Sequence, residues 1–322
     1  LQDGESVAVT GIGQINRSHM IAGLCRSLNR PMVVLCQDDL AARRLQEELK
    51  GFLSDTAPIL PSRDLTLYDA AVVSRSWEQK RLRQLYDLAV GKTPLQIMTW
   101  ESLSLRTMPK AALLSAAFSL EVGREYAVED LISRLTAAGY NRCGMVEGPG
   151  QFAVRGGILD IFSPAEDRPV RAEFFGDELD TMGFFDPANQ RRSENITSVT
   201  VLPVAETQPG LHPDGVEGLC KDITALISRQ KRRKNINEPL IATLEKDLNK
   251  YESGLHNPAS DRYMALIYPE MATAADYIPD GAVVAVCDHG NLQRAARSRC
   301  DEMGMQLDSM LGAGLVAGEL CD

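Results

Sequence analysis

The chain has 322 residues, enough for two domains or three small ones, each with its own core. Hydrophobic residues make up 44% of the sequence, and no apolar run approaches the roughly 20 residues of a membrane span, so no membrane partner is expected. The formal net charge of −10 argues against strong DNA binding by this chain, because neutralisation of phosphates supplies most non-specific nucleic-acid affinity.

The cysteines and the first residues indicate in which cellular compartment the protein is expected. The seven Cys are odd in number and no two have C-x-x-C spacing, which argues against a zinc site or a disulfide framework. Reduced thiols and a cytoplasmic location are therefore expected. The start, LQDGESVAVTG, has no basic leader before an apolar stretch, so no signal peptide is predicted. Because the chain begins with Leu1 rather than Met, we expect a segment of a longer protein.

Residues 1–116 alternate between apolar runs and amphipathic stretches, which indicates a mainly parallel sheet with helices on both faces. The predicted strands are VAVT (7–10), MVVLC (32–36), PIL (58–60) and LQIMT (95–99). Helices are predicted near 17–29, from Asp38 or Asp39 to Phe52, and at 76–90. In the second helix we expect Leu40, Leu45, Leu49 and Phe52 to share one face.

Residues 117–204 have a different character. One helix near 128–138 precedes short strand-like segments that are separated by turn formers such as Gly148-Pro149-Gly150 and Gly176-Asp177. This pattern predicts a small α+β domain with a mostly antiparallel sheet built from hairpins.

Residues 205–322 are helical again over about 214–250, with a basic run, RQKRRK at 229–234, that we interpret as a solvated helix surface. AVVAV (282–286) is then a lone apolar strand. Because it has no other sheet to join, we predict that it lies in one sheet with 7–10 and 32–36. The middle domain, 117–204, is then an insertion in a discontinuous α/β domain formed by 1–116 and 205–322.

The stretch after the first predicted strand partly matches the P-loop pattern G-x-x-x-x-G-K-[ST]. Gly11 and Ser18 are in register, but Asn16 replaces the second Gly and Arg17 replaces the Lys that reaches the terminal phosphates. Arg is not equivalent to Lys in that role. Three interpretations stay open: a working nucleotide site, a relic loop, and an unrelated strand-to-helix turn.

A second nucleotide-site motif is also incomplete. A Walker B strand ends in Asp-Glu, whereas AVVAV is followed by Cys287 and then by Asp288 and His289, so His replaces the Glu. Two defective motifs in one α/β domain indicate a degenerate P-loop core, RecA- or helicase-like, that no longer hydrolyses ATP. Gly11 and Gly13 also half-match the dinucleotide pattern G-x-G-x-x-G, which leaves an oxidoreductase as a weaker alternative. The letters G-K-T at 91–93 fit a helix C-cap better than a phosphate loop.

The densest motif lies at residues 139–193. It resembles the module shared by the excision-nuclease protein UvrB and the transcription-repair coupling factor (Mfd), and weaker matches extend the resemblance over nearly the whole chain. The matching positions are Gly139-Tyr140, Glu147, Pro149-Gly150, Phe152, Arg155-Gly156-Gly157, Asp160, Phe162, Arg171, Glu173-Phe174-Phe175, Asp177-Glu178, Asp180, Phe185-Asp186 and Gln190-Arg191.

Two differences favour the coupling factor over UvrB. The P-loop lysine is absent, and between Tyr68 and Trp77 stands only DAAVVSRS, too short for the aromatic hairpin with which UvrB clamps damaged DNA. The resemblance then implies a non-catalytic, UvrB-like module that binds no cofactor itself and recruits the excision-nuclease protein UvrA. It places the ATP- and Mg²⁺-dependent translocase, and the contacts with RNA polymerase and double-stranded DNA, in later domains. A functional UvrB-type P-loop ATPase or helicase is the alternative.

The resemblance also points to the partner surface. PVRAEFF reads as a strand of period two, with Arg171, Glu173 and Phe175 on one face and Ala172 and Phe174 on the other. Arg155, Arg171 and Phe175 match the positions with which the family binds UvrA, so we expect one exposed patch. The alternative is that Arg171 pairs with a neighbouring acid and Phe175 belongs to the core.

Overall fold

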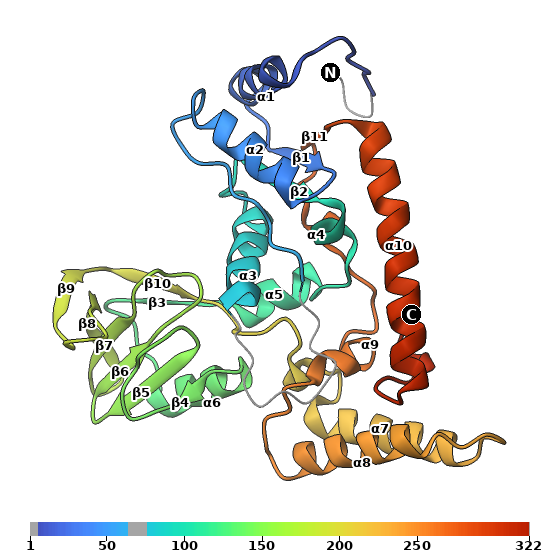
Figure 1. Cartoon of the computed structure of the whole chain (residues 1–322). Coiled ribbons are helices and arrows are strands. Elements are labelled where there is room, and N and C mark those ends of the chain that lie inside the picture. Colours follow the sequence, from blue (N-terminus) through green and yellow to red (C-terminus); the bar gives the residue numbers. More distant parts are fainter. Residues whose placement is uncertain (1–5, 64–75, 322) are drawn as a thin grey trace. The chain divides into compact units, whose positions relative to one another are not determined.

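The computed structural model describes residues 6–63 and 76–321, and the chain divides into two compact units (Figure 1). The first unit comprises 1–63, 84–107 and 272–304, and the second comprises 64–83, 108–271 and 305–322. Helices α3 (Ser76–Ala89) and α10 (His289–Gly312) each contribute residues to both. Among the residues described, no helix combines the length and the hydropathy needed to cross a membrane.

The first unit contains a three-stranded parallel sheet in the order β11-β1-β2. Its strands are β1 (Met32–Cys36), β2 (Leu95–Thr99) and β11 (Val283–Val286). All residues of β1 and β2 are buried, as expected for parallel strands covered on both faces. Met32 lies opposite Val283, so the prediction that the strand at 282–286 joins the strand at 32–36 is confirmed.

The prediction of a strand at residues 7–10 was wrong. Residues 6–10 have no regular secondary structure, and the side chains of Val7 and Val9 are mostly exposed. The physical reason lies in the sheet: β1 already pairs with β11 on one side and with β2 on the other, so no ladder position beside it is open. The loop before the first helix is therefore not preceded by a strand.

Helices cover this sheet. They are α1 (Gln14–Leu28), α2 (Asp39–Leu49) and α4 (Trp100–Ser104), and the short η3 (Ala274–Tyr277) packs on α4. Asp38 caps α2 by accepting a hydrogen bond from the backbone N–H of Ala41 at 2.8 Å. Leu45 and Leu49 of α2 pack into the core as expected, whereas Leu40 is exposed.

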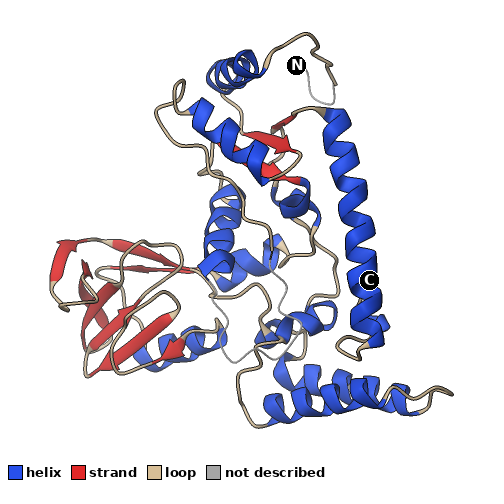
Figure 2. Cartoon of the chain, in the orientation of Figure 1, coloured by secondary structure: helices blue, strands red, loops and turns tan. Residues whose placement is uncertain are grey.

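The second unit contains a six-stranded sheet in the order β4-β5-β6-β7-β8-β9 and a two-stranded sheet of β3 and β10 (Figure 2). The six strands are β4 (Asn141–Arg142), β5 (Gln151–Arg155), β6 (Ile158–Ile161), β7 (Val170–Phe175), β8 (Glu178–Phe185) and β9 (Arg192–Asn195). The other two are β3 (Phe118–Glu121) and β10 (Ser198–Val201). Only the pair β4–β5 is parallel within the six, so the expected hairpin-built, mostly antiparallel sheet is confirmed.

One face of this sheet packs on α6 (Val128–Ala137). Leu131 and Leu135 of α6 share a core cluster with alternate residues of the strands, such as Phe152, Leu159 and Ala172. This is the period-two pattern of a sheet with one face on a helix, and it leaves the other face for the remaining side chains.

The rest of the second unit is helical. It contains α5 (Lys110–Ala116), η1 (Pro209–Leu211), α7 (Gly215–Lys231), α8 (Glu238–Glu252), η2 (Ser260–Tyr263), α9 (Met264–Ile267) and η4 (Gly318–Leu320). The predicted helical region at 214–250 is thus two helices with a turn between them. The basic run lies at the end of α7, where all its side chains except Gln230 are exposed.

A buried ion pair ties α3 to the segment after β10. Arg81 Nε donates to Glu206 Oε1 at 2.9 Å, and both side chains are fully buried. Its neighbour on the same helix, Arg83, pairs with Asp167 at 2.6 Å in an exposed position.

We predict that Gly183→Ala destabilises the six-stranded sheet by about 1–3 kcal/mol, the usual cost of overpacking. A Cβ at Gly183 would lie 2.5 Å from Arg192 Nε and 2.6 Å from the backbone oxygen of Glu194 in the adjacent strand. Gly144→Ala is the control, because a Cβ there meets nothing within 4 Å. Urea unfolding measures both variants, and an equal midpoint for the two would contradict the prediction.

Candidate partner-binding site

The face of the six-stranded sheet opposite α6 carries three consecutive rows of side chains. Strand register places Asp160 opposite Arg171 in the first row and Arg155 opposite Ile158 in the second, while Phe175 follows at the end of β7. Directly opposite residues share a face of a sheet. The fold therefore brings Arg155, Arg171 and Phe175 to one face.

A buried carboxylate lies at the centre of this face. Asp160 has no exposed side-chain surface, and it accepts hydrogen bonds from two arginines. Arg155 Nη2 donates to Oδ2 at 2.6 Å, while Arg171 donates through Nε to Oδ1 at 2.7 Å and through Nη2 to Oδ2 at 2.8 Å. The two-pronged contact with Arg171 is the geometry in which arginine and carboxylate bind most strongly.

The guanidinium of Arg171 is enclosed by further contacts. It donates from Nη1 to the backbone oxygen of Gln190 at 3.2 Å and from Nη2 to Gln190 Oε1 at 3.1 Å, and it lies 4.5 Å from the ring centre of Phe185. The hydrogen bonds with Asp160 raise the pKa of Arg171. The expectation that Arg171 is exposed was wrong, since only 15% of its side chain is accessible once Asp160 and the loop at Gln190 enclose it. The alternative interpretation, that it pairs with an acid, describes its contacts.

Phe175 and Arg155 are the accessible members of the patch. Phe175 is 84% exposed, so it is not a core residue, and the side chain of Arg155 is 45% exposed. Both stand at hairpin turns: Gly176 follows Phe175 with φ +64°, and Gly156 follows Arg155 with φ +59°, both in the left-handed region that favours glycine.

A second ion pair completes the face. Arg192 of β9 donates to Glu173 Oε1 at 3.0 Å and to the hydroxyl of Thr181 at 3.1 Å. The local sequence pattern predicts no role for Asp160, Glu173 or Arg192. For Asp160 the sequence holds a clue, because it is an acid in a strand that precedes the one with Arg171. Its ion pair with Arg171, however, depends on strand register.

The predicted nucleotide loop is partly helical. Gly11 has φ +78°, Asn16 is exposed, and α1 begins at Gln14, within the loop itself. Ser18 is buried, and its hydroxyl donates to the carboxylate of Glu48.

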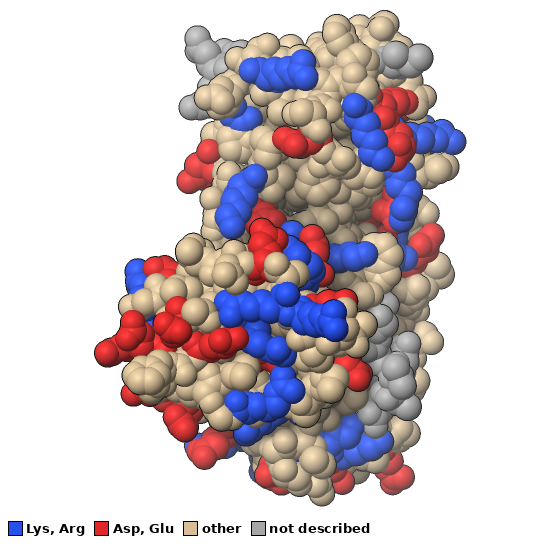
Figure 3. Space-filling model, turned by 90° about the vertical axis from the view of Figure 1, so that its left-hand side faces the viewer, with Lys and Arg blue, Asp and Glu red and all other residues tan. Residues whose placement is uncertain are grey.

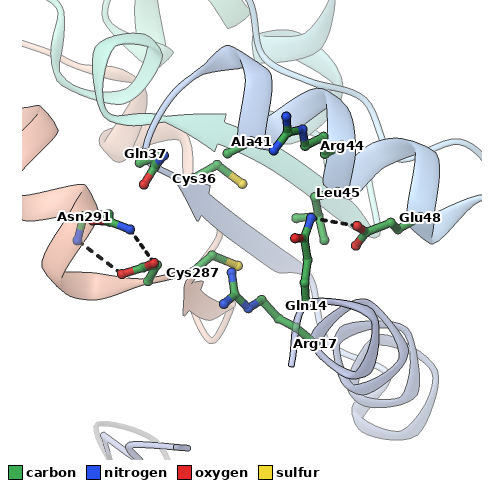
Figure 4. Close-up of a pocket in the computed structure, with 11 residues that line it drawn as sticks. Gln14, Arg17, Cys36, Gln37, Ala41, Arg44, Leu45, Glu48, Cys287 and Asn291 are labelled. Atoms are coloured by element: carbon green, nitrogen blue, oxygen red, sulfur yellow. Dashed lines mark hydrogen bonds between the residues drawn. The ribbon is translucent and has the colours of Figure 1, made fainter. Parts of the chain in front are cut away.

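A pocket of about 200 Å³ lies beside this loop (Figure 4). It is smaller than the roughly 300–1,000 Å³ of typical small-molecule sites. Arg17 and Arg44 line it together with Glu48 and Asp288, so charges of both signs face the space. Cys36 and Cys287 also line it; their mutual hydrogen bond lowers the pKa of Cys287 and raises that of Cys36.

The residues of the predicted Walker B motif are both exposed. Asp288 has φ +55° and accepts hydrogen bonds from the backbone N–H and the side-chain amide of Asn291, at 3.2 and 2.5 Å. His289 is the first residue of α10. Within 6–63 and 76–321, no cluster of His, Cys, Asp and Glu could hold a metal ion. The segment between Tyr68 and Trp77 mostly falls in 64–75, outside the described residues.

The sheet face lies in a part of the chain that matches a known protein family. Residues 118–206, which contain all of its side chains, match the model of the UvrB interaction domain. Over 97% of its length the chain is 25% identical to the transcription-repair-coupling factor of Bacillus subtilis. The chain is related to the transcription-repair-coupling factors. This relationship confirms the resemblance read from residues 139–193.

Two other relatives carry the same name. The chain is 33% identical over 64% of its length to the transcription-repair-coupling factor of Myxococcus xanthus, and 29% identical over 80% to that of Mycobacterium bovis. These alignments cover 18% and 21% of the relatives' own lengths, and that with the Bacillus subtilis protein covers 27%. The chain thus spans about a quarter of its relatives or less.

Proposed function

We propose that the chain is the repair-factor-recruiting part of a transcription-repair coupling factor, and that its UvrB interaction domain binds UvrA. The observation that supports this most is the exposed Phe175 beside the Arg155–Asp160–Arg171 cluster, within the residues that match the family. Aromatic and arginine side chains are the types enriched at the energetic centres of protein interfaces. An arginine favours an acidic surface on the partner.

The site is built for a protein rather than for DNA. The chain has a net charge of −10, and Figure 3 shows Lys and Arg side chains gathered in the middle of the drawn face with acidic side chains around them. The negative net charge opposes binding to the phosphates of nucleic acid. In the whole coupling factor, contacts with double-stranded DNA and RNA polymerase, and the ATP-driven translocation, then belong to other domains.

Calorimetric titration of the chain with purified UvrA tests the proposal. The expected result is saturable binding that weakens as salt increases, because interfaces that contain charges associate more slowly under screening. Absence of binding at the highest concentrations that both proteins tolerate would show that this chain does not recruit UvrA.

We predict that the chain hydrolyses no ATP. Asn16 and Arg17 replace the glycine and lysine of a phosphate loop, and the hydroxyl of Ser18 is engaged by Glu48. A phosphate-release assay with ATP and Mg²⁺ should match a buffer control. Turnover that Asp288→Ala abolishes would instead support the UvrB-type ATPase.

A further inference from the structure

The arginines beside Asp160 differ in how many donors they have left for a partner. Arginine has five N–H donors. Asp160 and Gln190 together accept four hydrogen bonds from Arg171, whose side chain is 15% exposed. Among the residues that the structure describes, Arg155 donates one side-chain hydrogen bond, from Nη2 to Asp160. Its side chain is 45% exposed. Arg155 is therefore the arginine with donors that an incoming protein can reach.

The position of Arg155 explains why it needs support. It is the last residue of β5, and the turn at Gly156 and Gly157 follows. A long side chain at such a place has many rotamers, and fixing it on binding costs conformational entropy. Its hydrogen bond with Asp160 removes much of that freedom in advance, because Asp160 is itself buried and held by Arg171.

We propose that Asp160 is a positioning residue for partner binding: it fixes the guanidinium of Arg155 in the orientation in which UvrA meets it. Arg171 then acts through Asp160, as an anchor, rather than by touching UvrA itself. The inference rests on the proposed function of this face. It divides the matching positions into two contact residues, Arg155 and Phe175, and an internal support made of Asp160 and Arg171.

Replacing Asp160 by Asn distinguishes two ways in which this face could bind UvrA: through a fixed orientation of Arg155, or through the attraction between its charge and an acidic partner. The change removes one negative charge from the face, so attraction alone would strengthen binding to an acidic partner. Positioning predicts the opposite: UvrA affinity falls about tenfold or more, since preorganisation lowers the cost of binding. Asp130→Asn on α6 is the matched control, because it makes the same charge change on the exposed side of the helix that covers the other face. Tighter or unchanged binding by Asp160→Asn would overturn the proposal.

A double-mutant cycle tests whether Asp160 acts through Arg155. In an Arg155→Ala background, Asp160→Asn should cause no further loss of UvrA affinity, because coupled residues are not additive. Relaxation of the Arg155 Nε–Hε group by ¹⁵N NMR gives a second readout, and the group should become more mobile in Asp160→Asn. A full additional loss in the Arg155→Ala background would show that Asp160 acts independently of Arg155.

Asp160→Asn leaves Arg171 poorly paired, so a thermal melt of each variant accompanies the binding data. If Asp160→Asn does not fold, Arg155→Lys replaces it, because this exposed change keeps the charge but loses the planar fork. We expect Arg155→Lys to weaken UvrA binding about tenfold, and native affinity would overturn the positioning role. Phe175→Ala distinguishes failure of the proposed function from failure of the positioning role. If Phe175→Ala binds UvrA normally, the proposed function of this face fails, whatever the result at Asp160.

Discussion

Arg81→Met is expected to lower the free energy of unfolding of the second unit by about 3–5 kcal/mol, the cost of breaking a buried ion pair from one side. Arg81 and Glu206 are fully buried and 2.9 Å apart, so removing the cation leaves a carboxylate without that partner in a low-dielectric interior. Urea unfolding followed by circular dichroism measures the change.

The same helix provides the control. Arg83→Met removes a cation two residues along α3, but its pair with Asp167 is exposed. Surface ion pairs contribute about 0–1 kcal/mol, so this variant should unfold close to the native midpoint. If the two variants unfold together, the buried pair contributes no more than the exposed one.

Phe175→Ala is expected to weaken UvrA binding by about 30-fold, which corresponds to the roughly 2 kcal/mol typical of an interface hot spot. Phe175 is 84% exposed, so its truncation removes little packing and the thermal melt should stay at the native temperature. Arg155→Ala should produce a loss of the same order. Calorimetry with purified UvrA measures both.

Leu255→Ala is the matched control for Phe175→Ala. Leu255 is another exposed apolar side chain, but it follows α8, outside the residues that match the UvrB interaction domain. Its truncation should leave UvrA affinity unchanged. An equal loss for the two variants would indicate a non-specific apolar effect rather than a defined face.

The parts of the fold with local signals could be predicted from the sequence. Apolar runs and alternation gave β1, β2 and the hairpins of the second unit, because both depend on residues close in the chain. The pairing of 282–286 with 32–36 was also predictable, since a lone apolar strand must find a sheet. The segment at 7–10 has the same apolar pattern but forms no strand, because ladder positions depend on which strands already flank β1.

On the face of the six-stranded sheet opposite α6, too, some features could be predicted from the sequence and others could not. Period two correctly predicted that Phe175 and Arg171 lie opposite the core-facing Ala172. It could not predict that Arg171 is largely enclosed, because enclosure comes from Asp160 in another strand and from the loop at Gln190. Such contacts are set by register and loop closure, which no local pattern encodes.

The order in which the chain leaves the ribosome has a consequence for the first unit. Its central strand, β1, pairs on one side with β11. That edge of β1 is therefore unpaired until Val283, the partner of Met32, has been synthesised. The six-stranded sheet at 141–195, whose strands pair mostly with sequence neighbours, is complete long before then. Domains generally fold as units during synthesis, and unpaired strand edges promote aggregation. During translation the sheet at 141–195 can therefore fold first, while the edge of β1 that pairs with β11 stays open until residues 283–286 have been made.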